Sequence, residues 1–283
     1  MIKNQVKTAV LLAALSGVLL FVGYLIGGYS GLTIALILAV TMNLVTYWFS
    51  DKIVLAMYRA KPIKKQDAPG IYKIVKEISQ KMGIPKPKIY FVPSDINNAF
   101  AVGRSPKKSA IAFTRGILNL LNKEEIKGVA AHELSHIKNR DTLIAVIAAT
   151  IAAIISYVAF MARFAAIFGG MRDREGGRGL ELLVLAIITP ILAMIIQLAI
   201  SRAREYLADE RAAKTLKTGK GLASALEKLE ASTKLISLRP TGATESTAHL
   251  FIVNPFRGKG IFTFFSTHPS VEARVKKLRS MSF

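Results

Sequence analysis

The apolar residues of this chain form two kinds of pattern, long unbroken runs and shorter periodic stretches. A helix needs about 20 apolar residues to cross a bilayer, and four runs reach or approach that length. They cover about residues 8–28, 32–49, 142–161 and 182–200. Only residues 27–31 separate the first two runs, and the first run is longer than the apolar core of a signal peptide. We therefore interpret this pair as a retained helical hairpin.

These runs divide the chain into four consecutive segments. We expect a transmembrane hairpin over residues 1–50, a second hairpin over 142–200, and water-soluble segments over 51–141 and 201–283. Because two membrane crossings separate the water-soluble segments, both lie on the same side of the membrane. They are expected to assemble into one domain.

Lysines and arginines beside the first hairpin indicate its orientation. The loop between its two helices has none, whereas several precede and follow the hairpin. They are Lys3, Lys7, Lys52, Arg59, Lys61, Lys64 and Lys65. Since cytoplasmic loops carry the excess of these residues, the water-soluble segments are expected on the cytoplasmic side of a plasma or inner membrane. The second hairpin indicates the opposite through Arg163, Arg172, Arg174 and Arg178, and we give the first hairpin more weight.

The periodic stretches of the first water-soluble segment predict an α+β fold. Residues 71–82 are apolar at helical spacing and predict an amphipathic helix. Residues 88–92 predict a short strand. Residues 98–102 and 110–114 predict two further strands, joined by a turn at Gly103–Pro106.

Helices account for most of the remaining soluble sequence. Asn122, followed three residues later by Glu125, is typical of a capping box at a helix N-terminus. Beyond the fourth run, helices are expected over residues 201–216 and 222–236. A final helix is expected near Pro269, because proline suits the first helical position.

The composition agrees with an integral-membrane protein and argues against several other classes of protein. Hydrophobic residues make up 52% of the 283 residues and charged residues 20%, with a formal net charge of +21. Such a positive balance suits nucleic acid or anionic lipid headgroups. Nucleic-acid binding is not expected, because the sequence lacks the motifs of nucleic-acid-binding domains. The absence of cysteine excludes disulfides and thiolate metal sites.

One motif carries recognisable chemistry. His132, Glu133 and His136 form the pattern H-E-x-x-H within the helix that follows Asn122. Residues four apart share a helix face, so the two imidazoles can bind one metal ion. Neutral imidazoles suit zinc, and a carboxylate beside the first ligand can take a proton from an attacking water. We therefore expect one zinc ion per chain, with Glu133 as general base. The alternative is a pair of surface histidines without a ligand.

The third ligand has to come from elsewhere in the chain. Glu205 starts the helix that leaves the fourth run, just as the histidine helix enters the third run. Since those runs pair as a hairpin, Glu205 is expected near the histidines. Asp209 lies one turn further on, where it could accept the spare ring N–H of a ligand histidine. The alternative for both residues is a solvated face paired with Arg202 or Arg204.

With these motifs in place, the chain resembles the HtpX family of membrane metalloproteases, relatives of the zinc proteases that process prenylated CAAX proteins. The resemblance covers nearly the whole chain, from the two leading spans to Thr267-His268-Pro269. It implies a zincin-like domain of the gluzincin type, in which His132, His136 and Glu205 bind zinc and Glu133 is the base. It also implies cleavage on the cytoplasmic side, in membrane-protein quality control and the stress response.

Three further assignments concern substrate and catalysis. The segment Asn98, Ala99, Phe100 and Ala101 is similar to the family segment that holds the substrate by strand addition, although it could equally be an interior strand. His268 could donate to the oxyanion of the tetrahedral intermediate, or it could serve only as a helix-entry residue. His249 is interpreted as structural.

The expected partners are the lipid bilayer and polypeptides that lie in or near the membrane, because the histidine helix leads into the third span within a few residues. Within the protease class, the alternative is a CAAX-type prenyl-protein protease. Outside it, the alternatives are a membrane metal-binding or transport protein and a non-catalytic scaffold. A transporter would place ionisable residues inside its spans, and a scaffold has no need of Glu133.

Overall fold

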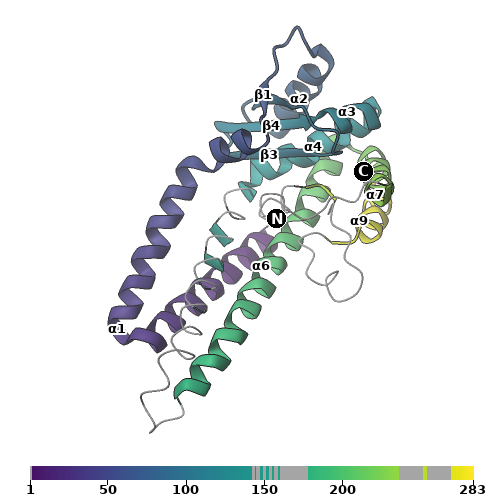
Figure 1. Ribbon diagram of the computed structural model, residues 1–283. Coiled ribbons are helices and arrows are strands. Elements are labelled where there is room, and N and C mark those ends of the chain that lie inside the picture. Colours follow the sequence, from purple (N-terminus) through teal and green to yellow (C-terminus); the bar gives the residue numbers. More distant parts are fainter. Residues whose placement is uncertain are drawn as a thin grey trace. The chain divides into compact units, whose positions relative to one another are not determined.

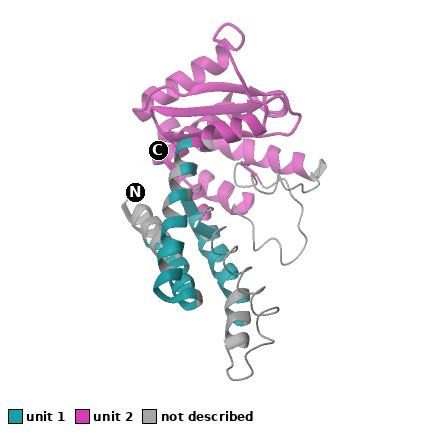
Figure 2. Ribbon diagram, turned by 60° about the vertical axis from the view of Figure 1, so that its left-hand side comes forward, with its two compact units in different colours: residues 1–48, 144–200 teal, residues 49–143, 201–283 magenta. Residues whose placement is uncertain are grey.

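A computed structural model describes residues 2–141, 178–235, 251–253 and 269–283, together with seven positions of the predicted third span. Those positions are Ile144, Ile147, Ala148, Ile151, Ala152, Ile155 and Ala159. The chain divides into two units, shown in different colours in Figure 2. One unit comprises residues 1–48 and 144–200, and the other comprises residues 49–143 and 201–283. Each unit is therefore built from two stretches that lie far apart in the sequence.

Helical segments make up the described part of the first unit. Helix α1 spans Ile2–Met57 and is interrupted at Gly27 and Gly28, where the backbone leaves helical angles. Gly28 has a φ of 56°, a left-handed conformation that glycine adopts without steric cost. Gly23 lets the two arms approach closely, because a Cβ atom there would lie 2.8 Å from the Cβ of Ala35. The interruption and this close approach together fold α1 back on itself.

The second long helix, α6, spans Arg178–Leu216. Its Ile187–Leu216 portion is the one described helix whose length and hydropathy would suffice to cross a membrane. Large apolar side chains on α1 and α6 are exposed, among them Phe21, Ile34, Ile37, Ile188 and Ile195. The predicted span 142–161 lies largely outside the described residues.

A four-stranded sheet organises the second unit. Its strands are β1 (Lys61–Pro62), β2 (Lys88–Val92), β3 (Ala99–Ser105) and β4 (Lys108–Thr114), in the spatial order β1-β2-β4-β3. β2 and β4 run parallel, whereas β3 and β4 form an antiparallel hairpin. Among the described strands β3 pairs only with β4, so β3 is an edge strand.

The three strands predicted from the sequence are confirmed, but the predicted turn was wrong in position. β3 continues through Gly103, and the turn consists of Pro106 and Lys107. Gly103 has a φ of 135° at a register irregularity, so it bends the strand without ending it. A turn residue in a sequence can therefore mark a bulge inside a strand.

Besides the last residues of α1 and residues 201–216 of α6, the described part of this unit contains five further helices. They are α2 (Pro69–Met82), α3 (Arg115–Leu120), α4 (Lys123–Asn139), α7 (Lys220–Leu235) and α9 (Val271–Arg279). α4 packs against α2, α7 and β3, as Figure 1 shows. The core that it shares with α2, α7 and α9 includes Val75, Ile117, Leu134, Leu226 and Leu278. This packing places α4, with its histidines, between the sheet and the other helices.

The predicted start of α4 is confirmed, and the last helix does begin near Pro269, although Pro269 is not its first residue. The Asn122 side chain accepts from the backbone N–H groups of Glu124 and Glu125, both at 3.0 Å. The Glu125 carboxylate accepts from the Asn122 N–H at 2.8 Å, which completes the capping box. α9 begins at Val271 with Ser270 as its N-cap, so Pro269 precedes the helix. The serine is the N-cap because its side chain accepts a hydrogen bond from a free backbone N–H at the start of the helix.

Candidate metal centre

Two helices bring the candidate ligands together inside the second unit. His132 and His136 lie one turn apart on α4, with ring centroids 4.6 Å apart. Glu205 lies on α6, and ligand atoms from all three residues fall within 4.8 Å of one another. His132 and Glu205 are buried, and His136 is nearly so. The structure thus places these three sequence-predicted residues in one cluster.

Carboxylates determine which ring nitrogens face the centre of this cluster. The Nδ1 of His132 lies 2.9 Å from the carboxylate of Asp209, and the Nδ1 of His136 lies 2.8 Å from that of Asp141. A carboxylate accepts hydrogen bonds, so each Nδ1 carries the proton and each Nε2 keeps a lone pair. The two Nε2 atoms face each other at 3.0 Å. The Glu205 oxygens lie 3.5 Å and 3.4 Å from the Nε2 atoms of His132 and His136.

Three electron-pair donors that converge in this way need a cation between them. Two lone-pair nitrogens cannot donate to each other, and the Glu205 carboxylate is also only an acceptor. A metal ion would accept from all three at once. The donor set therefore fits a metal ion on the geometry of these side chains alone.

The charge of the surrounding side chains leads to the same conclusion. Four buried carboxylates surround the histidines, those of Glu133, Asp141, Glu205 and Asp209. Among the described residues, two buried guanidinium groups face them, those of Arg204 and Arg274. With neutral histidines this leaves two negative charges, which one divalent cation would neutralise.

Behind each histidine lies a carboxylate, and behind each carboxylate lies an arginine. Behind His132, Asp209 accepts two hydrogen bonds from Arg274, at 2.8 Å and 2.7 Å. Behind His136, Asp141 is in contact with Arg204. Helix α4 ends at Asn139, and Arg140 adopts a left-handed φ of 58° that turns the chain so that Asp141 faces back toward His136. Both imidazoles are therefore oriented by a carboxylate that an arginine holds in turn.

The environment shifts the pKa values of the site. Burial by itself lowers the pKa of His132, but the hydrogen bond to Asp209 and the negative charge of Glu205 outweigh burial and raise it. His136 follows the same pattern, with Glu205 as the main opposing group. Burial would raise the pKa of Asp209, yet Arg274 and His132 lower it to about 2. Asp209 therefore stays ionised and remains a hydrogen-bond acceptor for His132.

Glu133 connects the histidine helix to the edge strand. Its side chain is 5% exposed, and burial raises the pKa of its carboxyl group. The backbone N–H of Ala101 in β3 donates a hydrogen bond to this carboxylate. β3 therefore lies directly beside the residue that the sequence nominates as the base.

The predicted substrate segment is buried, and Asn98 has partners of its own. Ala99, Phe100 and Ala101 are each no more than 5% exposed. The Asn98 side chain accepts from the backbone N–H of Ile252 at 3.1 Å. Its backbone pairs with Thr114 at the start of the β3–β4 ladder. His268 and His249 lie outside the described residues.

Sequence reasoning missed three residues of this site: Asp141, Arg204 and Arg274. Asp141 follows His136 by five residues, which is a usable signal once a left-handed residue is placed at the end of α4. Arg204 was considered only as a solvated partner of Glu205, whereas it is 5% exposed and contacts Asp141. Arg274 lies 65 residues beyond Asp209, and no local pattern distinguishes it from the other basic residues of α9.

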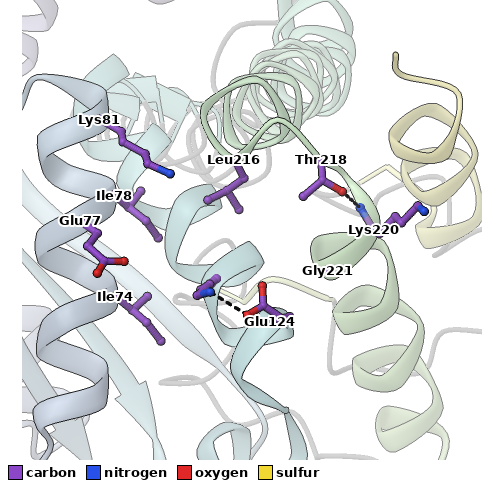
Figure 3. Close-up of a pocket in the computed structure, with 10 residues that line it drawn as sticks. Ile74, Glu77, Ile78, Lys81, Glu124, Leu216, Thr218, Lys220 and Gly221 are labelled. Carbon is purple, nitrogen blue, oxygen red and sulfur yellow. Dashed lines mark hydrogen bonds and ion pairs between the residues drawn. The ribbon is translucent and has the colours of Figure 1, made fainter. Parts of the chain in front are cut away.

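A separate pocket of the second unit contains none of the clustered histidines or their carboxylate partners. Figure 3 shows its lining, which comes from α2, the N-terminal ends of α4 and α7, and the turn after α6. The labelled residues are Ile74, Glu77, Ile78, Lys81, Glu124, Leu216, Thr218, Lys220 and Gly221. The unlabelled tenth residue, Lys127, forms an ion pair with Glu124 at 2.7 Å. This pocket mixes apolar and charged side chains and does not reach the metal ligands.

Known proteins resemble the chain over nearly all of its length. The sequence model of peptidase family M48 matches residues 65–282. A protease HtpX homolog of Syntrophobacter fumaroxidans is 50% identical over 282 residues, which cover 98% of this chain and 99% of that protein. Homologs of the same name from Pyrococcus furiosus and Aquifex aeolicus are 48% and 51% identical. Those alignments cover 98% and 93% of this chain, and 96% and 88% of the relatives.

The fold also resembles that of a solved structure. The crystal structure of S. mikatae Ste24p matches with a TM-score of 0.55 at 20% sequence identity. The match covers 98% of this chain but 65% of Ste24p, so this chain spans slightly less than two thirds of that protein. At this identity the likeness concerns the fold alone.

Proposed function

The chain belongs to peptidase family M48 and is a metalloprotease, and we propose that its metal is one zinc ion held by His132, His136 and Glu205. The observation that carries this proposal is the convergence of two imidazole lone pairs and one carboxylate on a common point. Catalytic zinc sites use three protein ligands of this kind and leave a fourth position open.

The distances between the donor atoms support zinc. Two atoms bound tetrahedrally at about 2.0–2.1 Å from zinc lie about 3.3 Å from each other. Here the two Nε2 atoms lie 3.0 Å apart, and the Nε2 atoms of His132 and His136 lie 3.5 Å and 3.4 Å from different oxygens of Glu205. The ligands therefore need little rearrangement to hold the ion.

Glu133 is proposed as the general base of peptide hydrolysis. When bound, the ion would polarise the scissile carbonyl and acidify the attacking water. The Glu133 carboxylate would take the proton of that water and pass it to the leaving amine. Burial and the hydrogen bond from Ala101 fix this carboxylate beside the cluster. His268, which lies outside the described residues, remains a candidate donor to the oxyanion.

The register of β3 supports binding of the substrate as an added strand. Thr114 donates to the Asn98 carbonyl, so Asn98, Phe100 and Val102 direct their backbone groups toward β4. Ala99 and Ala101 direct theirs away from β4. The edge becomes partly exposed from Gly103 to Ser105. We propose that an extended substrate pairs along this outer edge and reaches Glu133 at Ala101, as zincin substrates are expected to do.

We further propose a multi-pass membrane protein with four spans and a cytoplasmic active site. The exposed apolar side chains of α1 and α6 and the names of the HtpX relatives support membrane embedding. The positive residues around the first hairpin support the orientation. Substrates would then be membrane proteins or membrane-near segments, cleaved in quality control. A CAAX-type protease is the alternative, and the fold likeness to Ste24p does not decide between them.

One paired experiment tests the proposal. The full chain is purified and analysed for metal content, and its hydrolysis of a fluorogenic peptide is measured before and after chelation. Zinc at one equivalent, with activity lost on chelation and restored by zinc, is expected. A prenylated peptide with a C-terminal CAAX sequence serves as the competing substrate, and a strong preference for it would favour the alternative.

A further inference from the structure

We propose that Arg274 is a positioning residue of the metal centre, which orients Glu205 and Asp209 so that both can act on the ligand histidines. This inference rests on the metal centre proposed above. Arg274 comes from α9 near the C-terminal end of the chain, and neither the family motif nor the spacing of the histidines points to it.

The guanidinium group of Arg274 is fully engaged with the site. Its Nε and Nη2 donate to the two oxygens of Asp209 at 2.8 Å and 2.7 Å, a bidentate pair. Its Nη1 lies 3.2 Å from Oε2 of Glu205. The same Nη1 donates to the backbone carbonyl of Ile252 at 2.9 Å. The side chain is 1% exposed, so solvent does not weaken these interactions.

Glu205 and Asp209 need a group of this kind. They lie four residues apart on α6, where like charges repel each other. Oδ1 of Asp209 must face Nδ1 of His132, while Oε2 of Glu205 must face the Nε2 of the same ring. Arg274 donates a hydrogen bond to this Asp209 oxygen at 2.7 Å and lies at ion-pair distance, 3.2 Å, from this Glu205 oxygen. Its charge therefore attracts both carboxylates, which face the two nitrogens of one imidazole. Arg204, which lies beside Glu205 in sequence, instead contacts Asp141, the carboxylate behind His136.

The planar fork of arginine suits this task better than another cation would. Two parallel N–H groups match one carboxylate, and the charge of the same planar group can attract a second one. A lysine would keep the charge but could not make the bidentate pair. Arg274→Lys therefore separates the geometry of the group from its charge.

Two simpler roles make different predictions from positioning. If Arg274 only balanced the charge of the carboxylates, its removal would tighten cation binding, because the site would then contain one positive charge less to repel the ion. If it only joined α9 to the rest of the unit, its removal would lower thermal stability and leave zinc affinity and the coordination spectrum unchanged. Positioning alone predicts weaker zinc binding together with an altered coordination geometry.

The test uses the full chain in detergent, with Arg274→Met, Arg274→Lys and the control Arg279→Met. Arg279 lies on the same helix and pairs with Glu227, but both of those side chains are largely exposed. Zinc affinity is measured by competition with a chelator, and the visible spectrum is recorded after cobalt replaces zinc. At saturating zinc, kcat and KM are determined separately.

We expect Arg274→Met to lose zinc affinity by about 10–100-fold, the usual effect of removing an outer partner of a metal ligand. Its cobalt spectrum should change, and kcat should fall more than KM rises. Arg274→Lys should recover part of the affinity, and Arg279→Met should match the wild type. Zinc affinity in Arg274→Met that equals or exceeds that of the wild type would overturn the proposal.

A double variant keeps the test decisive if Arg274→Met does not fold. Arg274→Lys is compared in the wild type and in Asp209→Asn, where the fork has lost its charged partner. Positioning predicts a smaller loss of zinc affinity in the second background, and equal losses would contradict it. If the wild type itself binds no zinc, the proposed metal centre fails. If it binds zinc and the Arg274 variants bind equally, only this inference fails.

Discussion

At the scale of single residues, the proposed metal site depends on which atom of each side chain would face the ion. Asp209 and Asp141 keep a proton on each Nδ1, and this leaves both Nε2 lone pairs for the metal. Glu133 lies beside these ligands without taking their place, because its carboxylate is held by the Ala101 N–H. Ligand and base are thus separated by hydrogen bonding rather than by residue type.

The base can be removed without removing a ligand. Glu133→Gln keeps a side chain of the same shape but cannot accept the proton of the attacking water. The variant is expected to retain zinc at one equivalent while hydrolysis falls by at least about 100-fold, the lower end of what a general base contributes. Metal analysis and a peptide assay on the same preparation check this, and normal cleavage by the variant would refute the role.

The ligand and its supporting carboxylates should respond differently to substitution. Glu205→Ala removes one of three donors and is expected to abolish zinc retention after dialysis. Asp209→Asn and Asp141→Asn leave all donors in place and should cost about 10–100-fold in affinity, with zinc still bound at high concentration. If Asp209→Asn loses zinc on dialysis while Glu205→Ala keeps it, the assignment of ligand and support is reversed.

Sequence alone could nominate part of this site. His132, Glu133 and His136 share a short motif, and Glu205 follows from the pairing of the hairpins. Arg274 could not be found in this way, because its role depends on how α9 packs against α6. Burial is also invisible in sequence: Arg204 looks like a solvated residue and is 5% exposed.

At the scale of elements, local signals were reliable where side chains bond their own backbone. The capping box predicted the start of α4, and short stretches of mostly apolar residues predicted β2 and β4. The signals failed where two residues compete, as at Ser270 against Pro269, or where a bulge imitates a turn, as at Gly103. Which strand lies at the edge depends on sheet order, which no local pattern of this chain encodes.

Glu125 connects the start of α4 to α7, so substituting it tests the contact between these two helices. Its buried carboxylate accepts from Ser224 at 2.7 Å and from Lys228 at 2.9 Å, besides closing the capping box. Burial alone would raise its pKa, but Lys228, Ser224 and Asn122 together lower it. The ionised carboxylate therefore stabilises the fold above the ordinary pKa of about 4.3. This stabilisation is lost as the pH falls through the lowered pKa of the folded state.

Glu125→Gln is accordingly expected to lower the free energy of unfolding by about 1–3 kcal/mol at neutral pH. The difference from the wild type should shrink below about pH 4, where the wild-type carboxylate also becomes protonated. Melting curves across this pH range provide the measurement. Glu227→Gln, which breaks an exposed pair with Arg279, is the control and should change stability by about 0–1 kcal/mol. A pH-independent difference for Glu125→Gln would contradict the linkage.

At the scale of the whole molecule, each unit is assembled from two distant stretches of chain, as Figure 2 shows. The residues of the metal centre are divided accordingly, with the histidines before the second hairpin and Glu205 after it. Such a division works in a membrane protein only if both stretches are delivered to the same side. The proposed topology, with two crossings between the two stretches, would meet this condition.

The topology can be tested directly, because the chain contains no cysteine and every introduced thiol is unique. Ser30 follows the interruption of α1 and is exposed, while Ser105 ends the edge strand of the second unit and is partly exposed. In intact cells or right-side-out vesicles, Ser30→Cys is expected to react with a membrane-impermeant maleimide. Ser105→Cys should react only after permeabilisation, because the positive residues around the first hairpin favour a cytoplasmic catalytic unit. Reaction of Ser105→Cys from outside would reverse the orientation. A third cysteine, at Gly170, tests whether the arginines of the second hairpin lie outside. Reaction there from outside would show that the positive residues around the first hairpin determine the orientation.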